Sequence, residues 1–165
     1  MSIYTIVPDE QHSWPGDHVR RYLATDGADG YWADFTAVGG PARAPNLILT
    51  VTGRRSGKSH MHGLIFGEFD GRFVIVGSKG GAPDHPAWYL NLLANPEVHV
   101  QIRERKFLAK ARVAAGDERA ELWALMSGLY SGYADVQKLT AREFPVVVID
   151  PVGQPDPEVA PAPRP

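Results

Sequence analysis

A lysine within a glycine-rich turn offers the clearest chemistry in this chain. An apolar run, Phe73–Val76, leads into Gly77-Ser78-Lys79-Gly80-Gly81-Ala82, and a short helical pattern opened by Pro86 follows. Glycines let a backbone approach a ligand closely, because they carry no Cβ. Proline suits the first turn of a helix, and a helix N-terminus carries a partial positive charge with free N–H groups. The pattern predicts an anion-binding corner centred on Lys79.

A second group of cationic side chains follows the strand-like run Leu47–Thr52. It comprises Arg54, Arg55, Lys58 and His60 on a glycine-flanked turn. Like charges at this density repel one another unless an anion lies among them, and the planar guanidinium group pairs well with phosphate. The sequence leaves open the alternative of a solvated surface turn that binds nothing.

The run Thr52–Ser59 resembles a nucleotide triphosphate-binding loop but lacks its spacing. That loop has four residues between its glycines and a helix after its Lys-Ser pair. Here Gly53 and Gly57 enclose only three residues, and the alternation over His60–Phe66 predicts a strand. We therefore expect no nucleotide triphosphatase.

Three histidines raise the question of a metal site. His60 and His62 share one face of the predicted strand, and His85 lies in the glycine-rich segment further along the chain. The chain has no cysteine, so disulfides and thiolate ligands are excluded. No pattern supplies a third ligand beside the histidine pair, and we predict no metal.

The composition fits one globular domain and excludes several classes of function. A chain of 165 residues can bury a full core, and its net charge of −2 argues against a nucleic-acid binder. No apolar run approaches the roughly 20 residues of a membrane span. We expect a cytoplasmic protein acting on a small molecule. Peripheral contact with a membrane, and the choice between monomer and homodimer, stay open.

Composition and periodicity also predict the domain and its elements. Residues 1–16 are expected to be flexible, 17–151 to fold, and the proline-rich 152–165 to be disordered. Helices are predicted over about 17–35 with a glycine break and a second short helix at Trp32–Phe35, and over 86–94, 117–133 (with Asp117 as its N-cap) and 134–142. Strands are predicted over 47–52, 60–69, 72–79, 98–103, 107–113 and 145–150, with a tight hairpin turn at Asp70-Gly71. Mostly hairpin connections favour an α+β fold with a six-stranded antiparallel barrel.

Two segments together resemble the deazaflavin-dependent nitroreductase family. One is Thr52-Gly-Arg-Arg-Ser-Gly followed by a hairpin, and the other runs from Ser78 to Pro96 and continues into Glu97-Val-His-Val-Gln. The likeness extends more loosely over 17–151. It implies a split β-barrel of the FMN-binding-like type with flanking helices. It also implies an oxidoreductase that uses the deazaflavin coenzyme F-420, with FMN as the less favoured cofactor.

The resemblance implies a cofactor site built from both cationic segments. In that family the basic turn and the lysine hold the phosphate and acidic tail, the glycine-rich backbone lies near the ring, and the following helix completes the cleft. The implied cofactor-binding residues are Arg54, Arg55, Ser56, Lys58, His60, Ser78, Lys79, Gly80, Gly81, Ala82, Trp88 and Asn91. We expect the backbone N–H groups of 80–82 to donate to the ring or phosphate. Core packing of Trp88 and helix capping by Asn91 are the structural alternatives.

The implied catalytic residues are Ser78, Tyr130 and Tyr133. A tyrosine would donate a proton to the reduced substrate or form the wall of its pocket; packing against the barrel is the alternative. The chain departs from the family pattern at Ser59-His60, where a proline–arginine pair is common, and at Gly63, where proline is common. Histidine is a weaker, pH-dependent cation, so this departure bears on cofactor affinity.

These expectations combine into one reaction and two alternatives. The predicted reaction is hydride transfer from reduced deazaflavin to a small electron-poor substrate, namely a quinone, an activated alkene or a nitroaromatic compound. The alternatives are an FMN-dependent reductase on the same fold and a non-catalytic protein that binds a cofactor or a hydrophobic anion. No carboxylate pair or Ser-His-Asp pattern supports a hydrolase.

Overall fold

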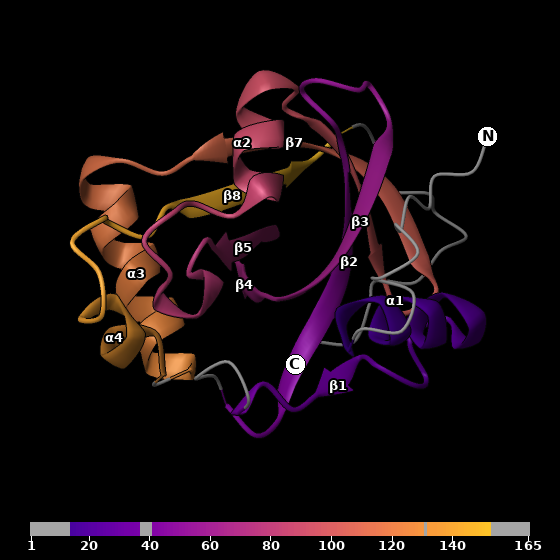
Figure 1. Cartoon of the computed structure of the whole chain (residues 1–165), viewed down its shortest axis with the longest axis horizontal. Coiled ribbons are helices and arrows are strands. Elements are labelled where there is room, and N and C mark those ends of the chain that lie inside the picture. Colours follow the sequence, from indigo (N-terminus) through magenta and orange to yellow (C-terminus); the bar gives the residue numbers. More distant parts are fainter. Residues whose placement is uncertain (1–13, 37–40, 131, 153–165) are drawn as a thin grey trace.

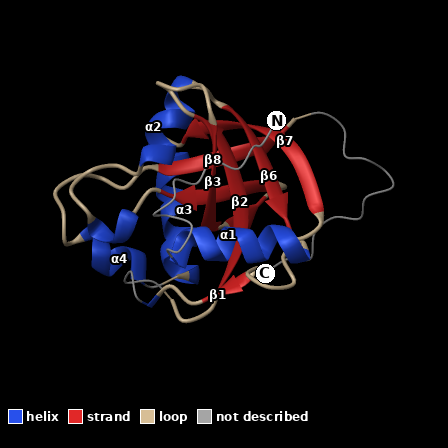
Figure 2. Ribbon diagram, turned by 45° about the vertical axis from the view of Figure 1, so that its right-hand side comes forward, coloured by secondary structure: helices blue, strands red, loops and turns tan. Residues whose placement is uncertain are grey.

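The computed structural model describes residues 14–36, 41–130 and 132–152 of the chain. It shows an α+β fold in which a strongly curled antiparallel sheet is flanked by helices (Figures 1 and 2). The elements in chain order are α1 (Trp14–Thr25), β1 (Trp32–Ala33), β2 (Ala44–Thr52), β3 (Ser59–Ile65), β4 (Gly67–Phe69), β5 (Arg72–Val76), η3 (Lys79–Gly81), α2 (Ala87–Ala94), β6 (Glu97–Ile102), β7 (Arg105–Val113), α3 (Gly116–Leu129), α4 (Gly132–Gln137) and β8 (Val146–Pro151).

The strand pairing curls the sheet into a half-barrel. The order is β1-β2-β6-β7-β8-β5-β4, and β3 pairs with the other edge of β2. Strand β3 pairs with β2, and β4, which follows it directly in the chain, pairs with β5. The β3–β4 segment therefore connects the two ends of the curled sheet. Strands β2, β6, β7, β8 and β5 have a paired neighbour on both sides, which protects their edges, whereas β3 pairs with β2 alone.

The number of strands differs from the sequence-based expectation. Six strands were predicted, whereas the described residues form eight. The predicted strand 60–69 is broken at Phe66, which is buried and whose backbone N–H donates to the carbonyl of Pro45 at 3.4 Å. The short β1 pairs with the start of β2, so Trp32 lies in a strand and not in the predicted second helix. The hairpin turn Asp70-Gly71 is confirmed, with φ of 53° and 76°.

The long strand β2 is the centre of the fold. Its residues are buried along almost the whole length, which explains why 47–52 is a run of strand-favouring residues without a polar-apolar alternation. Strands β6 and β7 alternate between buried and more exposed residues over most of their length, as the sequence predicted, except that Gln101 is buried and Val113 is exposed. One core cluster fills the barrel, and a second lies between β5, β8 and the helices α3 and α4.

The helices cover the barrel at positions that matter for the site. Helix α1 packs against β3 and α2 against β2, while η3 lies beside α4 (Figures 1 and 2). Helix α1 begins at Trp14, three residues before the predicted start of the folded domain. The N-cap of α3 is Ala115 and not the predicted Asp117, which lies inside the helix. The predicted helix 117–133 ends at Leu129, and α4 begins at Gly132.

The predictions for the chain ends fall mostly outside the described residues. Segments 1–13 and 153–165 lie beyond them. Among the helices that the structure describes, none is both long and apolar enough to cross a membrane.

Candidate active site

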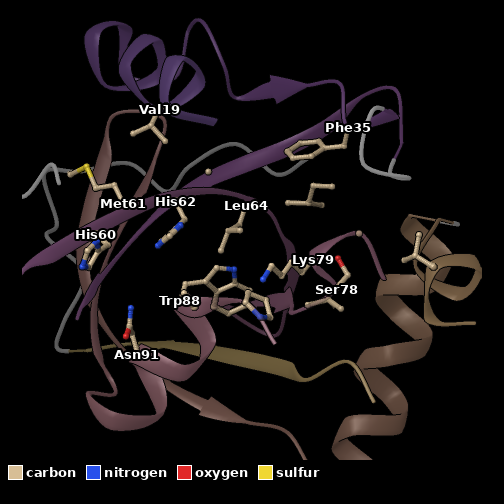
Figure 3. A pocket seen from close by; sticks show the side chains of 18 of the residues that line it. Val19, Phe35, His60, Met61, His62, Leu64, Ser78, Lys79, Trp88 and Asn91 are labelled. Carbon is tan, nitrogen blue, oxygen red and sulfur yellow. The ribbon is translucent and has the colours of Figure 1, made fainter. Parts of the chain in front are cut away.

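A cavity of about 870 Å³ lies between β3, α2, the glycine-rich turn and the start of α4. His60, His62 and Leu64 alternate along β3 and so share one face, opposite Trp88 and Asn91 of α2 (Figure 3). Lys79 and Ser78 close the side away from His60 in that view. The two cationic segments that the sequence singled out therefore meet at one cavity.

The turn between β2 and β3 holds two arginines at this cavity. The Gly53 N–H donates to the carbonyl of Lys58 at 2.7 Å, and the Gly57 N–H donates to the carbonyl of Gly53 at 2.9 Å. A Cβ on Gly53 would lie 2.7 Å from Ser56 Oγ and 3.2 Å from the carbonyl oxygen of Lys58, so the turn is tightly packed at this glycine. Both arginines, Arg54 and Arg55, are exposed and line the cavity.

Asn91 orients one of these arginines. Its side chain is only 6% exposed, and its Oδ1 accepts bonds from Arg54 N at 3.1 Å and from Arg54 Nη1 at 2.8 Å. The contact joins helix α2 to the β2–β3 turn. Asn91 therefore fixes the direction of the guanidinium group, which capping of α2 alone would not do.

The glycine-rich turn adopts an uncommon backbone conformation. Lys79, Gly80 and Gly81 have φ of 45°, 62° and 84° in succession. A non-glycine residue in this region is strained by about 1 kcal/mol or more, so Lys79 is held there by its surroundings. Gly81 is packed so closely that a Cβ would lie 2.9 Å from the carbonyl oxygen of Val136.

The turn uses its own N–H groups. The Gly81 N–H donates to Ser78 O at 2.9 Å, and the Ala82 N–H donates to Lys79 O at 3.1 Å. The expectation that these two groups donate to a ligand is therefore wrong, because the turn needs them for its own closure. Gly80 lines the cavity, whereas Gly81 and Ala82 do not.

The charge of the cavity is one-sided. Arg54, Arg55 and Lys79 line it, and no Asp or Glu is present among the described residues of its wall. Within the part of the chain that the structure describes, none of these three cations takes part in an ion pair. A chain of net charge −2 thus concentrates unpaired positive charge in one hollow. Such a hollow favours an acidic occupant.

Another part of the wall is apolar and aromatic. Tyr130 and Tyr133 line it together with Phe35 and Val136, and each of the four is at most 8% exposed. The Tyr130 hydroxyl donates to the carbonyl of Phe66 at 2.9 Å, and burial raises the pKa of this phenol to about 12. Burial also raises the pKa of Tyr133. Both phenols therefore stay protonated at neutral pH.

His62 is a polar exception in the wall. Its Nε2 is buried and has no hydrogen-bond partner among the described residues. Burial, with a smaller contribution from the neighbouring His60, lowers the pKa of His62 to about 4. The imidazole is therefore neutral at neutral pH and adds no charge to the cavity.

Gly63 explains one departure from the family pattern. A Cβ at this position would lie 2.4 Å from Nδ1 of His18, which packs onto β3 from helix α1. His18 is buried, and its Nε2 lies 2.7 Å from the carbonyl oxygen of Gly30. The ring fills the space that a side chain at position 63 would need.

Comparison with known proteins identifies the family. Residues 18–151 match the family described as F420H(2)-dependent quinone reductase. The chain belongs to this family. An F420H(2)-dependent quinone reductase of Mycobacterium tuberculosis (strain ATCC 25618 / H37Rv) is 33% identical over 112 residues, covering 66% of this chain and 75% of that protein.

Two solved structures of similar sequence identity to this chain agree with the fold. One, described as an F420-H2 dependent reductase (FDR-A), is 39% identical with a TM-score of 0.60, over 64% of this chain and 94% of the other. The second, described as a domain-swapped dimer, is 34% identical with a TM-score of 0.63, over 81% and 95%. The predicted split barrel, the deazaflavin-dependent oxidoreductase activity and the coenzyme F-420 are confirmed.

Most of the predicted site residues meet at the cavity. The structure places there Arg54, Arg55, Ser56, His60, Ser78, Lys79, Gly80, Trp88, Asn91, Tyr130 and Tyr133. Lys58 does not line it; its backbone carbonyl accepts a bond from the Gly53 N–H within the turn. No cluster of three or more His, Cys, Asp or Glu that could hold a metal occurs in the described ranges.

Sequence reasoning missed several parts of the wall. Val19 of α1 and Phe35 lie far from the motifs in the chain, and single apolar residues carry no pattern that marks them as a pocket. His62 was weighed only as a metal ligand. The set of side chains fits a flat, acidic deazaflavin, because three cations and an apolar, aromatic surface line the same cavity.

Proposed function

We propose that this protein reduces a quinone in the described cavity, with the acidic part of coenzyme F-420 held by Arg54, Arg55 and Lys79. The observation that carries the proposal is the meeting of these three unpaired cations in one cavity whose described wall has no carboxylate. Ion pairs with phosphate and carboxylate groups would neutralise this charge. When bound, the reduced deazaflavin supplies the hydride.

The remaining wall suits a flat, electron-poor substrate. Phe35, Tyr133 and Val136 give it an apolar surface that excludes water, and family membership favours a quinone over the activated alkenes and nitroaromatics. Reduction of a quinone to a quinol consumes one hydride and one proton. The chain must therefore let a proton reach the quinone oxygen.

Tyr133 is the better placed of the two tyrosines for this proton. Tyr130 gives its hydroxyl hydrogen to the carbonyl of Phe66, whereas Tyr133 makes no such bond within the described residues. We propose that Tyr133 donates a hydrogen bond to the quinone oxygen and that Tyr130 is part of the wall. Ser78, whose hydroxyl points into the cavity in Figure 3, is proposed to orient the same ring.

Binding measurements test the proposed cofactor site. Purified protein is titrated with oxidised coenzyme F-420, with FMN, and with a deazaflavin analogue that lacks the phosphate and acidic tail. The proposal predicts tight binding of the full coenzyme, weaker binding of the other two, and a loss of affinity with added salt only for the charged ligands. Equal affinity for the full coenzyme and the tail-less analogue would contradict it.

Kinetics test the reaction and the tyrosine assignment. Stopped-flow oxidation of the reduced coenzyme by menadione is followed for wild type, Tyr133→Phe and Tyr130→Phe. We expect kcat to fall about 100-fold in Tyr133→Phe, the lower range for loss of a general acid, and to change less than 5-fold in Tyr130→Phe. Equal losses in the two variants would reject the assignment, and no turnover by wild type across quinones and enones would favour a carrier protein.

We also propose that the chain forms a homodimer. Support comes from the relative of 34% identity that is described as a domain-swapped dimer. Light scattering coupled to size exclusion chromatography decides the point, because a monomer mass of 18.0 kDa would reject it. The cytoplasmic location stays a prediction that cell fractionation can check.

A further inference from the structure

Arg142 contacts the glycine-rich turn without lining the cavity. Its Nη1 donates to the carbonyl of Gly77 at 2.9 Å, its Nη2 to that of Ser78 at 2.8 Å, and its Nε to that of Ala82 at 2.8 Å. One guanidinium group thus binds the carbonyls that precede and follow the lysine. These bonds come from a residue that lies 60 or more positions further along the chain.

The arginine is itself held in place. Its backbone carbonyl accepts a bond from Gln137 Nε2 at 2.7 Å, and its guanidinium carbon lies 4.8 Å from the ring centre of Phe144. Its Nη1 also lies 3.2 Å from Nδ1 of His85, which must accept and therefore carries no hydrogen there. The group that binds the turn is oriented before any ligand arrives.

The turn needs such support because of its backbone. Three successive residues with positive φ include one non-glycine, Lys79, and this conformation is unfavourable for a residue with a Cβ. Two internal hydrogen bonds close the turn, from Gly81 and Ala82. Hydrogen bonds from a charged donor are stronger than those from a neutral donor, so the three bonds from Arg142 add to the support of the turn.

We propose that Arg142 is a positioning residue: it holds the turn in the conformation that directs Lys79 and Ser78 into the cavity. The inference rests on the proposed function in that the turn is taken to bind the coenzyme. Planar geometry is essential, because only the fork of a guanidinium group reaches carbonyls on both sides of the turn. A lysine at this position would keep the charge and lose the geometry.

The test compares Arg142→Met and Arg142→Lys with Arg119→Met. Arg119 is a matched control. Its guanidinium group also donates to a backbone carbonyl, that of Phe144 at 2.7 Å, but among the described residues it makes no hydrogen bond to residues 77–82. We expect the dissociation constant of the oxidised coenzyme to rise about 10-fold or more in both Arg142 variants and less than 2-fold in Arg119→Met. Equal affinities in Arg142→Met and wild type would overturn the proposal.

A double-mutant cycle with Lys79→Ala separates positioning from general stability. If Arg142 directs the lysine, Lys79→Ala weakens binding in the wild-type background but by less than 2-fold in Arg142→Met. If the losses of affinity caused by Lys79→Ala and Arg142→Met multiply fully in the double variant, the lysine keeps its place without Arg142, and the proposal is wrong.

Amide hydrogen exchange gives a reading that needs no coenzyme. Exchange at Gly81 and Ala82 should be at least 10-fold faster in Arg142→Met than in Arg119→Met at the same distance below the melting temperature. Unchanged exchange would overturn the positioning role even if the coenzyme binds elsewhere. Conversely, faster exchange in a protein that binds no deazaflavin would support the positioning role while refuting the proposed function.

Discussion

Gly63→Ala is a single-methyl substitution that should destabilise the whole barrel. The added Cβ would lie 2.4 Å from Nδ1 and 2.6 Å from Cε1 of His18, well inside van der Waals contact. The imidazole cannot move away freely, because its Nε2 lies 2.7 Å from the carbonyl oxygen of Gly30 and the ring is 2% exposed. Either β3 or helix α1 must shift.

The magnitude follows from two opposing effects. Overpacking a well-packed site costs about 1–3 kcal/mol, while replacing glycine by alanine in a strand recovers about 0.5–1 kcal/mol of backbone entropy. A net loss of about 1–2 kcal/mol corresponds to a fall in melting temperature of roughly 3–6 °C for a domain of this size. Thermal unfolding followed by circular dichroism measures it.

The His18→Ala background tests the cause. With the ring removed, the methyl group has room, so Gly63→Ala should be neutral or slightly stabilising there. Gly71→Ala is the matched control for general effects of glycine replacement, since nothing lies within 4 Å of its Cβ position; its positive φ of 76° makes it destabilising in both backgrounds alike. Equal destabilisation by Gly63→Ala with and without His18 would refute the reasoning.

Two further predictions follow from the charges of the cavity. Lys79→Ala should weaken binding of the oxidised coenzyme by about 1.5–3 kcal/mol, or roughly 10- to 150-fold, as expected for loss of a hydrogen bond to a charged group. Fluorescence titration measures this affinity. In the same titration Lys110→Ala, which replaces an exposed lysine on β7, should have no effect. An unchanged affinity would remove Lys79 from the site. For His62, the pKa falls from its ordinary 6.5 to about 4 on folding, so between these values the unfolded chain binds more protons and the free energy of unfolding decreases as the pH falls from 6.5 to 4. Urea unfolding should show that the free energy of unfolding falls by up to about 3 kcal/mol over this range, since each of the 6.5 − 4 = 2.5 pH units contributes about 1.36 kcal/mol. His62→Asn should reduce this fall. An identical pH profile in that variant would exclude His62 as the cause.

The sequence predicted much of the fold because local patterns encode it. Alternation in β6 and β7 marked half-buried strands, and Asp70-Gly71 marked a hairpin turn with two positive φ values. It failed where a tertiary contact decides: Phe66 breaks a strand because its backbone bonds to Pro45, 21 positions away in the chain by 66 − 45. Local propensity carries no information about such a partner.

The site divides in the same way. By itself the sequence determined which segments carry charge and which turn needs glycine, since residue type and backbone freedom are local properties. The meeting of Arg54 and Lys79 in one hollow required the curled sheet, because their segments lie on different strand connections. Only the tertiary structure decided that the N–H groups of Gly81 and Ala82 are already used, that Asn91 orients Arg54, and that Arg142 binds the carbonyls of a turn 60 residues before it. Hydrogen bonds to backbone carbonyls depend on position in space and leave no mark on the residue types of the segment that accepts them.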